Sequence, residues 1–372
     1  MSMPAAPAAP PTPDLTTPAP AEVGFDPDAL ADAVRFAAAH EIGWSRDIAA
    51  QLAKGQFEPP PWNEVLGPTS PRGAPQGAIV RHGRLAATWG EPDRADMTFS
   101  VAKSYLAVLA GIAVGDGLIA DADARVAVTA LDDGFTSPQN RTITWHHLLQ
   151  QTSEWEGTVW SKPDQIDRYR QLGPDADNSR KGEARPLASP GTYWEYNDVR
   201  VNRLSLSLMQ CFRRPLPEIL ADRIMTPTGA SDGWAWRGYD NAWEEIAGNR
   251  MQGVPGGSHW GGGLWISARD QARLGQLILQ GGRWGQRQLL PAAWCERMLS
   301  PCEINPEYGY LWWLNTGRQR WPAASAEAAA AIGAGGNIIL VEPAHQLVVV
   351  ARWLDDAATA DFIARVIAAI AD

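Results

Sequence analysis

A serine and a lysine lie one helical turn apart in the segment FSVAKSYLAVLAG, at Ser100 and Lys103. Side chains three positions apart share one face of a helix, so the hydroxyl and the amine can touch. The partial positive charge of a helix N-terminus, together with burial, disfavours an ammonium group there. A neutral Lys103 can take the proton of Ser100, and the unpaired backbone N–H of Ser100 can face an oxyanion. The spacing therefore predicts a serine nucleophile with a lysine as its proton acceptor.

The same pair has a structural alternative, in which Ser100 is an ordinary N-cap and Lys103 a snorkelling lysine. The Ser-x-x-Lys spacing, however, resembles the first motif of the superfamily of serine β-lactamases, penicillin-binding proteins and related esterases. The segment PGTYWEYNDVRVN is similar to the family's second motif, a Tyr-x-Asn after Pro-Gly, and reads Tyr196-Asn197-Asp198 here. The resemblance implies that Tyr196 relays a proton to the leaving group and later helps to activate water. By itself, a tyrosine in an aromatic run is expected in the core.

Asp198 departs from this pattern, because the family has asparagine at the corresponding position. A carboxylate here can pair with Lys103 and stabilise its ammonium form. The sharing of protons among Ser100, Lys103 and Tyr196 then differs from the neutral-lysine scheme. Asp198 is also a candidate for contact with substrate.

The nearest match to the family's third motif, Lys-Thr-Gly or His-x-Gly, is the run AIGAGGN at residues 331–337. Glycines at Gly333 and Gly335 let a substrate approach the backbone. The resemblance implies that the Ala334 N–H is the second oxyanion donor beside that of Ser100. The alternative is a flexible turn that leads into a strand.

Ala331 stands where the family has a lysine or histidine, so the usual partner for a substrate carboxylate is absent. We therefore favour an esterase or amidase of a small neutral or apolar substrate, similar to family VIII carboxylesterases or 6-aminohexanoate-dimer hydrolases. β-Lactamase or D-alanyl peptidase activity is an alternative within the enzymes. Outside the enzymes, the alternative is a non-catalytic protein that keeps the fold and senses a ligand.

Tryptophans near these motifs are candidates to line an apolar cleft, above all Trp155, Trp194 and Trp260, although each can equally be a packing residue. The stretch TWHHLLQQTSEWEG resembles the family's LLxHTSG segment, and GGGLWISARDQARLGQLILQGG resembles its glycine-rich turn and following helix. A competing nucleophile signal, GASDG at residues 229–233, matches G-x-S-x-G. It follows a helical pattern and not a strand, so we interpret it as a turn.

Strand patterns at the two ends of the chain flank a helical middle. GAIVRHGRLAATWG predicts a hairpin about His82-Gly83, NIILVEPAHQLVVVARWL predicts another about Pro343-Ala344, and residues 356–372 predict an amphipathic helix. Asp26 followed by Pro27 predicts the start of the first helix. Neither hairpin can bury a sheet face alone, so we expect both in one antiparallel sheet.

The expected fold class is α+β, similar to β-lactamases and transpeptidases: an antiparallel sheet flanked by terminal helices, plus a mainly helical lobe. Residues 1–22 form a Pro/Ala-rich tail that we expect to be disordered, and residues 23–372 one domain. Its α/β lobe comprises about residues 23–110 and 305–372, and its helical lobe about residues 111–304.

Composition limits the partners of this 372-residue chain. A net charge of −10 without a basic patch argues against nucleic-acid or anionic membrane partners, and no apolar run is long enough to span a bilayer. The 3 cysteines and 6 histidines have no spacing typical of disulfide frameworks or metal sites, so we expect no metal and no cofactor. The N-terminal residues lack the pattern of a signal peptide, which predicts a cytoplasmic protein. The sequence leaves the oligomeric state open.

Overall fold

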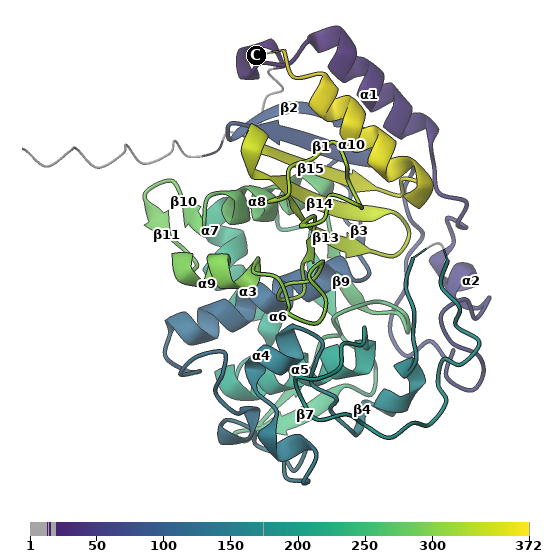
Figure 1. The fold of residues 1–372 in the computed structure, drawn as a ribbon, viewed down its shortest axis with the longest axis vertical. Helices are drawn as coiled ribbons and strands as arrows, with labels where there is room; N and C mark the ends of the chain where they lie inside the picture. The colour runs from purple at the N-terminus through teal and green to yellow at the C-terminus, as the bar shows by residue number, and fades with distance from the viewer. Residues whose placement is uncertain (1–12, 14, 16–19, 174, 372) are drawn as a thin grey trace, which may run out of the picture.

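The computed structural model describes residues 13, 15, 20–173 and 175–371, and its central element is an antiparallel sheet of six strands (Figure 1). The strand order is β12-β13-β14-β15-β1-β2, so strands from both ends of the chain lie side by side. The strands are β1 (Gln76–Arg81), β2 (Arg84–Trp89), β12 (Trp313–Leu314), β13 (Ala329–Gly333), β14 (Asn337–Glu342) and β15 (Leu347–Arg352). β1 pairs with β15, which confirms the prediction that the two hairpins share one sheet.

Both predicted hairpin turns are confirmed. His82 and Gly83 connect β1 to β2 with positive φ angles of 50° and 73°, a conformation that glycine adopts without steric cost. Pro343–His345 forms a 3₁₀ turn between β14 and β15, where the Glu342 carboxylate accepts a hydrogen bond from His345 N at 2.8 Å. These turns set the register that directs alternate side chains to opposite faces.

The terminal helices α1 (Pro27–Ala39) and α10 (Thr359–Ala368) pack against each other over one face of the sheet (Figure 1). Asp26 caps α1 by accepting hydrogen bonds from Asp28 N and Ala29 N, and Pro27 begins the helix as predicted. Their apolar sides enclose a core with alternate strand residues, including Leu347 and Val349. Both sheet faces are covered, which explains why β14 and β15 are buried along their whole length.

The opposite face of the sheet is covered by α8 (Ala268–Leu279) and by α3 (Val101–Gly115). Gly275 of α8 faces Val348 of β15 so closely that a Cβ there would overlap it. Because α8 packs on the sheet, the predicted helical lobe of residues 111–304 is wrong at this helix. Periodicity predicts a helix but does not reveal which layer the helix joins.

α3 also packs against α5 (Asp198–Phe212). The other α-helices are α2 (Ile48–Leu52), α4 (Trp145–Leu149), α6 (Leu216–Leu220), α7 (Thr226–Thr228) and α9 (Ala292–Met298). A three-stranded sheet has the order β3-β9-β6, with β3 (Asp96–Met97), β9 (Gly263–Ile266) and β6 (Ala235–Arg237). Three two-stranded ribbons pair β4 (Thr158–Val159) with β5 (Lys162–Pro163), β7 (Trp243–Ile246) with β8 (Asn249–Gln252), and β10 (Arg283–Trp284) with β11 (Arg287–Gln288).

Short turns of other helix types complete the described chain. The 3₁₀ segments are η1 (Ala21–Val23), η2 (Val126–Val128), η3 (Asn140–Thr142), η4 (Asp164–Asp167), η6 (Pro343–His345) and η7 (Asp356–Ala358), and η5 (Ala221–Met225) is a π-helix.

The predicted N-terminal tail lies mostly outside the described residues. Leu15, however, is buried, and its carbonyl accepts a hydrogen bond from Arg269 at 2.6 Å. Together with η1, this contact shows that the predicted tail boundary at residue 22 is too late. Among the described residues, no helix has the length and apolar character needed to cross a membrane.

Candidate active site

Ser100 occupies the N-cap of α3, three residues after the end of the strand β3. Thr98 N donates to Leu264 O of β9 at 2.9 Å, and this bond fixes the chain just before the serine. Phe99 has a φ of 51°, an uncommon conformation for a residue with a side chain, and it turns the chain sharply from β3 into α3. Lys103, one turn into the helix, donates a hydrogen bond from Nζ to Ser100 Oγ at 2.8 Å. The predicted contact between hydroxyl and amine is therefore present.

Asp198 forms an ion pair with Lys103 through Oδ1, and both side chains are buried. Lys103 Nζ also donates to Gly256 O at 3.2 Å. Burial opposes ionisation of Asp198, but His259, Lys103 and Arg170 beside it hold the pKa of its carboxyl well below the usual range. The structure therefore has the ion pair with Lys103 that aspartate at this position predicts.

Tyr196 reaches the same group from a distant part of the sequence. Its ring centroid lies 4.9 Å from Lys103 Nζ and 5.1 Å from the guanidinium of Arg170. The ring also stacks on Trp313 at 5.7 Å. The first and second motifs thus meet around Lys103, with the tyrosine buried beside the lysine.

The local sequence explains how the second motif is held. Asn197 caps α5 by accepting from Arg200 N at 3.1 Å, and it donates from Nδ2 to Asp164 O at 2.9 Å. Gln151 accepts at Oε1 from Asn197 N at 3.1 Å. Gln151 belongs to the stretch that resembles LLxHTSG, so this stretch supports the tyrosine loop.

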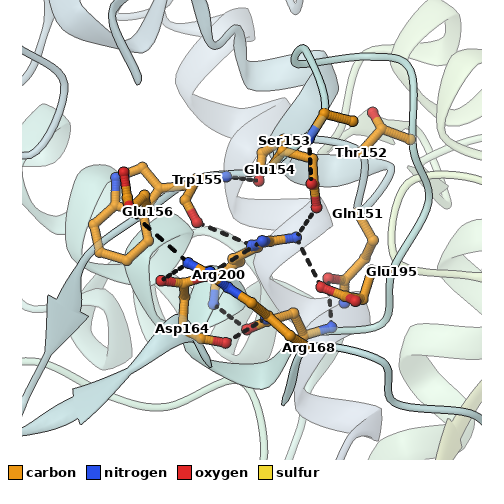
Figure 2. A network of polar contacts seen from close by, with 12 residues as sticks. Gln151, Thr152, Ser153, Glu154, Trp155, Glu156, Asp164, Arg168, Glu195 and Arg200 are labelled. Atoms are coloured by element: carbon orange, nitrogen blue, oxygen red, sulfur yellow. Dashed lines mark hydrogen bonds and ion pairs between the residues drawn. The ribbon is translucent and has the colours of Figure 1, made fainter. Parts of the chain in front are cut away.

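A network of buried charges lies behind this loop and centres on Arg200 (Figure 2). Its guanidinium contacts Glu154 at 2.7 Å, Glu195 at 3.2 Å and Asp164 at 3.3 Å. Burial raises the pKa of Glu195, because the arginines around it offset only part of the desolvation. These contacts connect the residues before and after Tyr196 to η4 and to the 151–156 segment.

The third motif lies against the start of α3. A Cβ on Gly333, the last residue of β13, would overlap Thr98 O and lie 3.1 Å from Ser100 N. Glycine is therefore required for β13 to approach the nucleophile's backbone. Ala334 follows directly and is half-buried beside the apolar cluster of Phe99 and Trp353.

Gly335 does not face Ser100. A Cβ there would stand 2.8 Å from the ring of Trp353 and 3.2 Å from that of Trp44, and its φ is 83°. Its role in this structure is the turn into β14 and close packing. The neighbouring turn is held by Asn337, which donates from Nδ2 to Ala334 O at 2.8 Å and accepts from Arg352 Nε at 2.6 Å.

The three candidate tryptophans have different surroundings. Trp194 packs edge-on against Trp313 at 6.2 Å and lies 6.4 Å from Tyr196, so it belongs to the aromatic wall around the tyrosine. Trp155 is buried and donates to Gly134 O at 2.8 Å, while Trp260 is buried and donates to Trp62 O at 2.7 Å. The indole nitrogens of Trp155 and Trp260 are therefore both engaged by backbone carbonyls within the fold.

Sequence reasoning missed two glycines that cover the lysine. A Cβ on Gly257 would stand 3.0 Å from Asp198 Oδ1, 3.4 Å from Lys103 Nζ and 3.7 Å from Ser100 Oγ. One on Gly256 would overlap Val201 of α5. The glycine-rich run PGGSHWGGG was the available signal, since repeated glycines in one loop indicate close backbone approach.

His259 and Arg170 were missed as well. His259 is buried and stacks on Phe57 at 4.0 Å, with Nδ1 lying 3.5 Å from Asp198 Oδ2. Arg170 contacts the same carboxylate oxygen. Only the folded chain brings these two residues to Asp198.

Two cavities of the described residues lie away from the serine. One, of about 240 Å³, is lined by residues that include His146, His147 and Tyr310, and another, of about 480 Å³, by residues that include Trp155 and Arg203. Ser100 lines neither. In the part of the chain that the structure describes, no histidine, cysteine and carboxylate side chains cluster as a metal site would require.

The competing serine, Ser231, lies in a turn between α7 and β6 and donates a hydrogen bond to Asp270 at 2.6 Å. The interpretation of GASDG as a turn is confirmed. Cys211, Cys295 and Cys302 are free.

Comparison with known proteins agrees with this geometry. Structural neighbours include a penicillin-binding protein homologue from Caulobacter crescentus, with 16% identity, a TM-score of 0.60, and coverage of 93% of this chain and 99% of that chain. They also include EstCE1, a hydrolase with promiscuous acyltransferase activity, with 16% identity, a TM-score of 0.58 and the same coverages of 93% and 99%. A family VIII carboxylesterase has 16% identity, a TM-score of 0.57, and coverages of 92% and 96%.

No curated protein matches the sequence. The sequence model described as Beta-lactamase matches residues 77–368, which include the serine-lysine helix, the tyrosine loop and the glycines at the end of β13. The predicted β-lactamase and transpeptidase-like α+β fold is confirmed, and the chain belongs to the β-lactamase family.

Proposed function

We propose that this protein is a serine hydrolase that cleaves an ester or amide bond of a small substrate through an acyl-enzyme at Ser100. The observation that carries the proposal is the hydrogen bond of 2.8 Å from Lys103 Nζ to Ser100 Oγ, formed beside the ring of Tyr196. A serine whose hydroxyl accepts a hydrogen bond from a buried amine, with a tyrosine ring beside that amine, has the groups that nucleophilic catalysis requires.

In the proposed acylation, Ser100 Oγ forms a bond to the substrate carbonyl carbon, and its proton passes to the Lys103–Tyr196 pair. The backbone N–H groups of Ser100 and Ala334 stabilise the oxyanion. The bond to the leaving group then breaks as the leaving oxygen or nitrogen receives that proton through Tyr196. Water attacks the acyl carbon in the second half, and the acid product leaves while Ser100 regains its proton.

The electrostatics of the site favour an uncharged substrate. Ala331 is buried in β13 opposite Ile339, so no side chain there presents a cation. Arg170 is already engaged by Asp167 and Asp198. A substrate carboxylate would have to compete with these buried acids, which supports an ester or a linear amide over a β-lactam.

A fluorophosphonate probe with peptide mass spectrometry tests the nucleophile. We expect one adduct, on the peptide that contains Ser100, and its loss in Ser100→Ala. Ser104→Ala is the matched control, because Ser104 lies on the same helix but donates to Leu311 O at 2.7 Å and has no contact with Lys103 Nζ. Absence of an adduct on Ser100 would contradict the proposal and favour a ligand sensor.

A comparison of a short acyl ester, a linear amide and nitrocefin tests the substrate class. We expect turnover of the ester or the amide and little of nitrocefin. Faster turnover of nitrocefin would overturn the preference and identify a β-lactamase.

A further inference from the structure

Buried acidic and basic side chains form a closed ring beside the nucleophile. Asp198 contacts Arg170, Arg170 contacts Asp167 at 3.4 Å, and Asp167 contacts Lys181 at 3.1 Å. Lys181 contacts Glu58 at 2.9 Å, Glu58 contacts His259 Nδ1 at 3.4 Å, and this nitrogen returns to Asp198 at 3.5 Å. Every side chain in this ring is at most 10% exposed. We name the set Asp198, Arg170, Asp167, Lys181, Glu58 and His259 the charge ring.

The charge ring is not electrically balanced by itself. With His259 neutral, it contains three carboxylates and two cations, a net charge of −1. Lys103, bound to Asp198 from outside the ring, supplies the missing positive charge when it is an ammonium. A buried site resists an uncompensated charge, so the ring and Lys103 together require one further proton beyond those on Arg170 and Lys181.

Two groups can hold this proton, and both contact the same carboxylate. Lys103 Nζ lies on Oδ1 of Asp198, and His259 Nδ1 lies 3.5 Å from Oδ2. A proton on His259 weakens the attraction of Asp198 for a proton on Lys103, and the reverse also holds. Asp198 is therefore an electrostatic connection between an imidazole and the amine that contacts the nucleophile.

The other side chains packed around His259 take no part in this exchange of a proton. Phe57 stacks on the imidazole with an interplanar angle of 4°, and Trp260 packs edge-on at 6.0 Å. Lys162 lies 5.2 Å from the ring of Trp260 and donates to Trp62 O at 3.0 Å, and burial lowers its pKa. Burial together with the neighbouring carboxylates raises the pKa of Tyr239 well above its usual value, so this phenol stays uncharged.

We propose that His259 is a positioning residue that shares one proton with Lys103 across Asp198, so that Lys103 becomes a base for Ser100 when His259 carries the proton. This inference rests on the proposed function. In the form of the enzyme that attacks, the proton has moved to His259 and Lys103 is a neutral amine. As the bond from Ser100 Oγ to carbon forms, the serine proton moves to Lys103, and the added positive charge balances the new oxyanion. The leaving group takes up that proton as its bond breaks, which leaves an acyl group on Ser100 and restores the neutral amine of Lys103.

The charge state of the His259 ring, observed by ¹⁵N NMR at neutral pH, tests the shared proton without any substrate. Lys103→Met removes the competing amine, so His259 must become an imidazolium. Asp198→Asn removes the carboxylate that needs the proton, so His259 must be neutral. Opposite responses are expected, whereas loose packing would move both variants in one direction. The same charge state of His259 in both variants would overturn the proposal.

Lys103→Arg covers the case in which the methionine variant does not fold. A guanidinium keeps its charge at all relevant pH values, so His259 must remain neutral. An imidazolium at neutral pH in Lys103→Arg would also overturn the proposal. Since this measurement needs no turnover, an inactive protein whose His259 switches as described retains the shared proton but loses the proposed function.

The pH dependence of kcat/KM on an activated ester provides the kinetic arm. His259→Asn keeps a planar polar group, but an amide cannot hold the proton. Lys103 can then act as a base only after it has lost its own proton to solvent. We expect a loss of about 10- to 100-fold at neutral pH that diminishes as the pH rises. His146→Asn is the matched control, because His146 bonds Tyr310 at 2.7 Å outside the ring, and it should keep the wild-type profile. A loss in His259→Asn that is equal at all pH values would contradict the proposal.

Discussion

Gly333 lies directly against the backbone of Ser100, so close that a Cβ on the glycine would be 3.1 Å from the serine nitrogen. The contact joins the end of β13 to the start of α3, and Ala334, the residue that carries the proposed second oxyanion donor, follows Gly333 directly. The distance between the proposed oxyanion donors thus depends on the absence of a side chain at Gly333.

Gly333→Ala should separate β13 from α3. The added methyl would overlap Thr98 O, so we expect a loss of about 1–3 kcal/mol of stability and a fall in kcat of about 100-fold. Urea denaturation and ester hydrolysis measure the two effects. Gly317→Ala is the control, since a Cβ there meets only the Gln319 side chain at 3.6 Å. An active Gly333→Ala enzyme with wild-type kcat would show that this contact does not position the oxyanion donors.

Tyr196→Phe should lower kcat by about 100- to 10,000-fold while leaving the fold intact, because phenylalanine keeps the stacking on Trp313 but cannot carry a proton. Steady-state kinetics and thermal denaturation of the same sample distinguish a loss of kcat from a loss of stability. Tyr308→Phe is the matched control: its ring packs against Tyr196 at 6.2 Å and is buried. Equal losses of kcat in both variants would indicate a packing role for Tyr196.

Asp198→Asn restores the asparagine of the family but leaves the Lys103 and Arg170 cations without their shared carboxylate. Breaking a buried pair in this way typically costs about 3–5 kcal/mol, and we expect a loss of that size by urea denaturation at neutral pH. A variant as stable as wild type would show that the asparagine pairs adequately with both cations.

Acid titration of stability gives a second test of Asp198. Its folded pKa is held well below the usual value, so its contribution is complete above the unfolded pKa of about 3.9 and is lost as the pH falls through the folded pKa. Wild type should therefore lose more stability than Asp198→Asn as the pH falls from about 4. Parallel pH curves for the two proteins would contradict the ionised, buried carboxylate.

Arg200→Met should destabilise the loop that holds Tyr196. The change leaves the carboxylates of Glu154, Asp164 and Glu195 without their central cation (Figure 2), and we expect a loss of about 3–5 kcal/mol in urea denaturation. Arg214→Met is the control, since Arg214 is half-exposed and pairs with Glu218 at the surface, where such a pair contributes at most about 1 kcal/mol. Similar losses in the two variants would contradict a structural role for the network.

The sequence predicted much of the fold because its signals are local. Turn residues at His82-Gly83, the capping group of Asp26 and the periodicity of the terminal helix each depend on a few neighbouring positions. The placement of α8 on the sheet was not predictable in this way, because a helix pattern shows an apolar face but not the surface that covers it.

The candidate site was predictable where a motif carries it. Ser100, Lys103 and Tyr196 follow family spacings, and the structure brings them together. His259 and Arg170 reach Asp198, and Glu58 reaches His259, from separate loops, and no spacing along the chain encodes these contacts. The ion pair between Asp198 and Lys103 could be predicted from the sequence. The charge ring around Asp198 could not, because its members meet only in the folded chain.

The most direct measurement of the central claim is a rapid-quench experiment with an activated ester, combined with intact-protein mass spectrometry. We predict a burst of product that equals the enzyme concentration, together with a mass increase of one acyl group that fragments to Ser100. Wild-type turnover of the ester without a burst, or with the acyl group on another residue, would contradict the account.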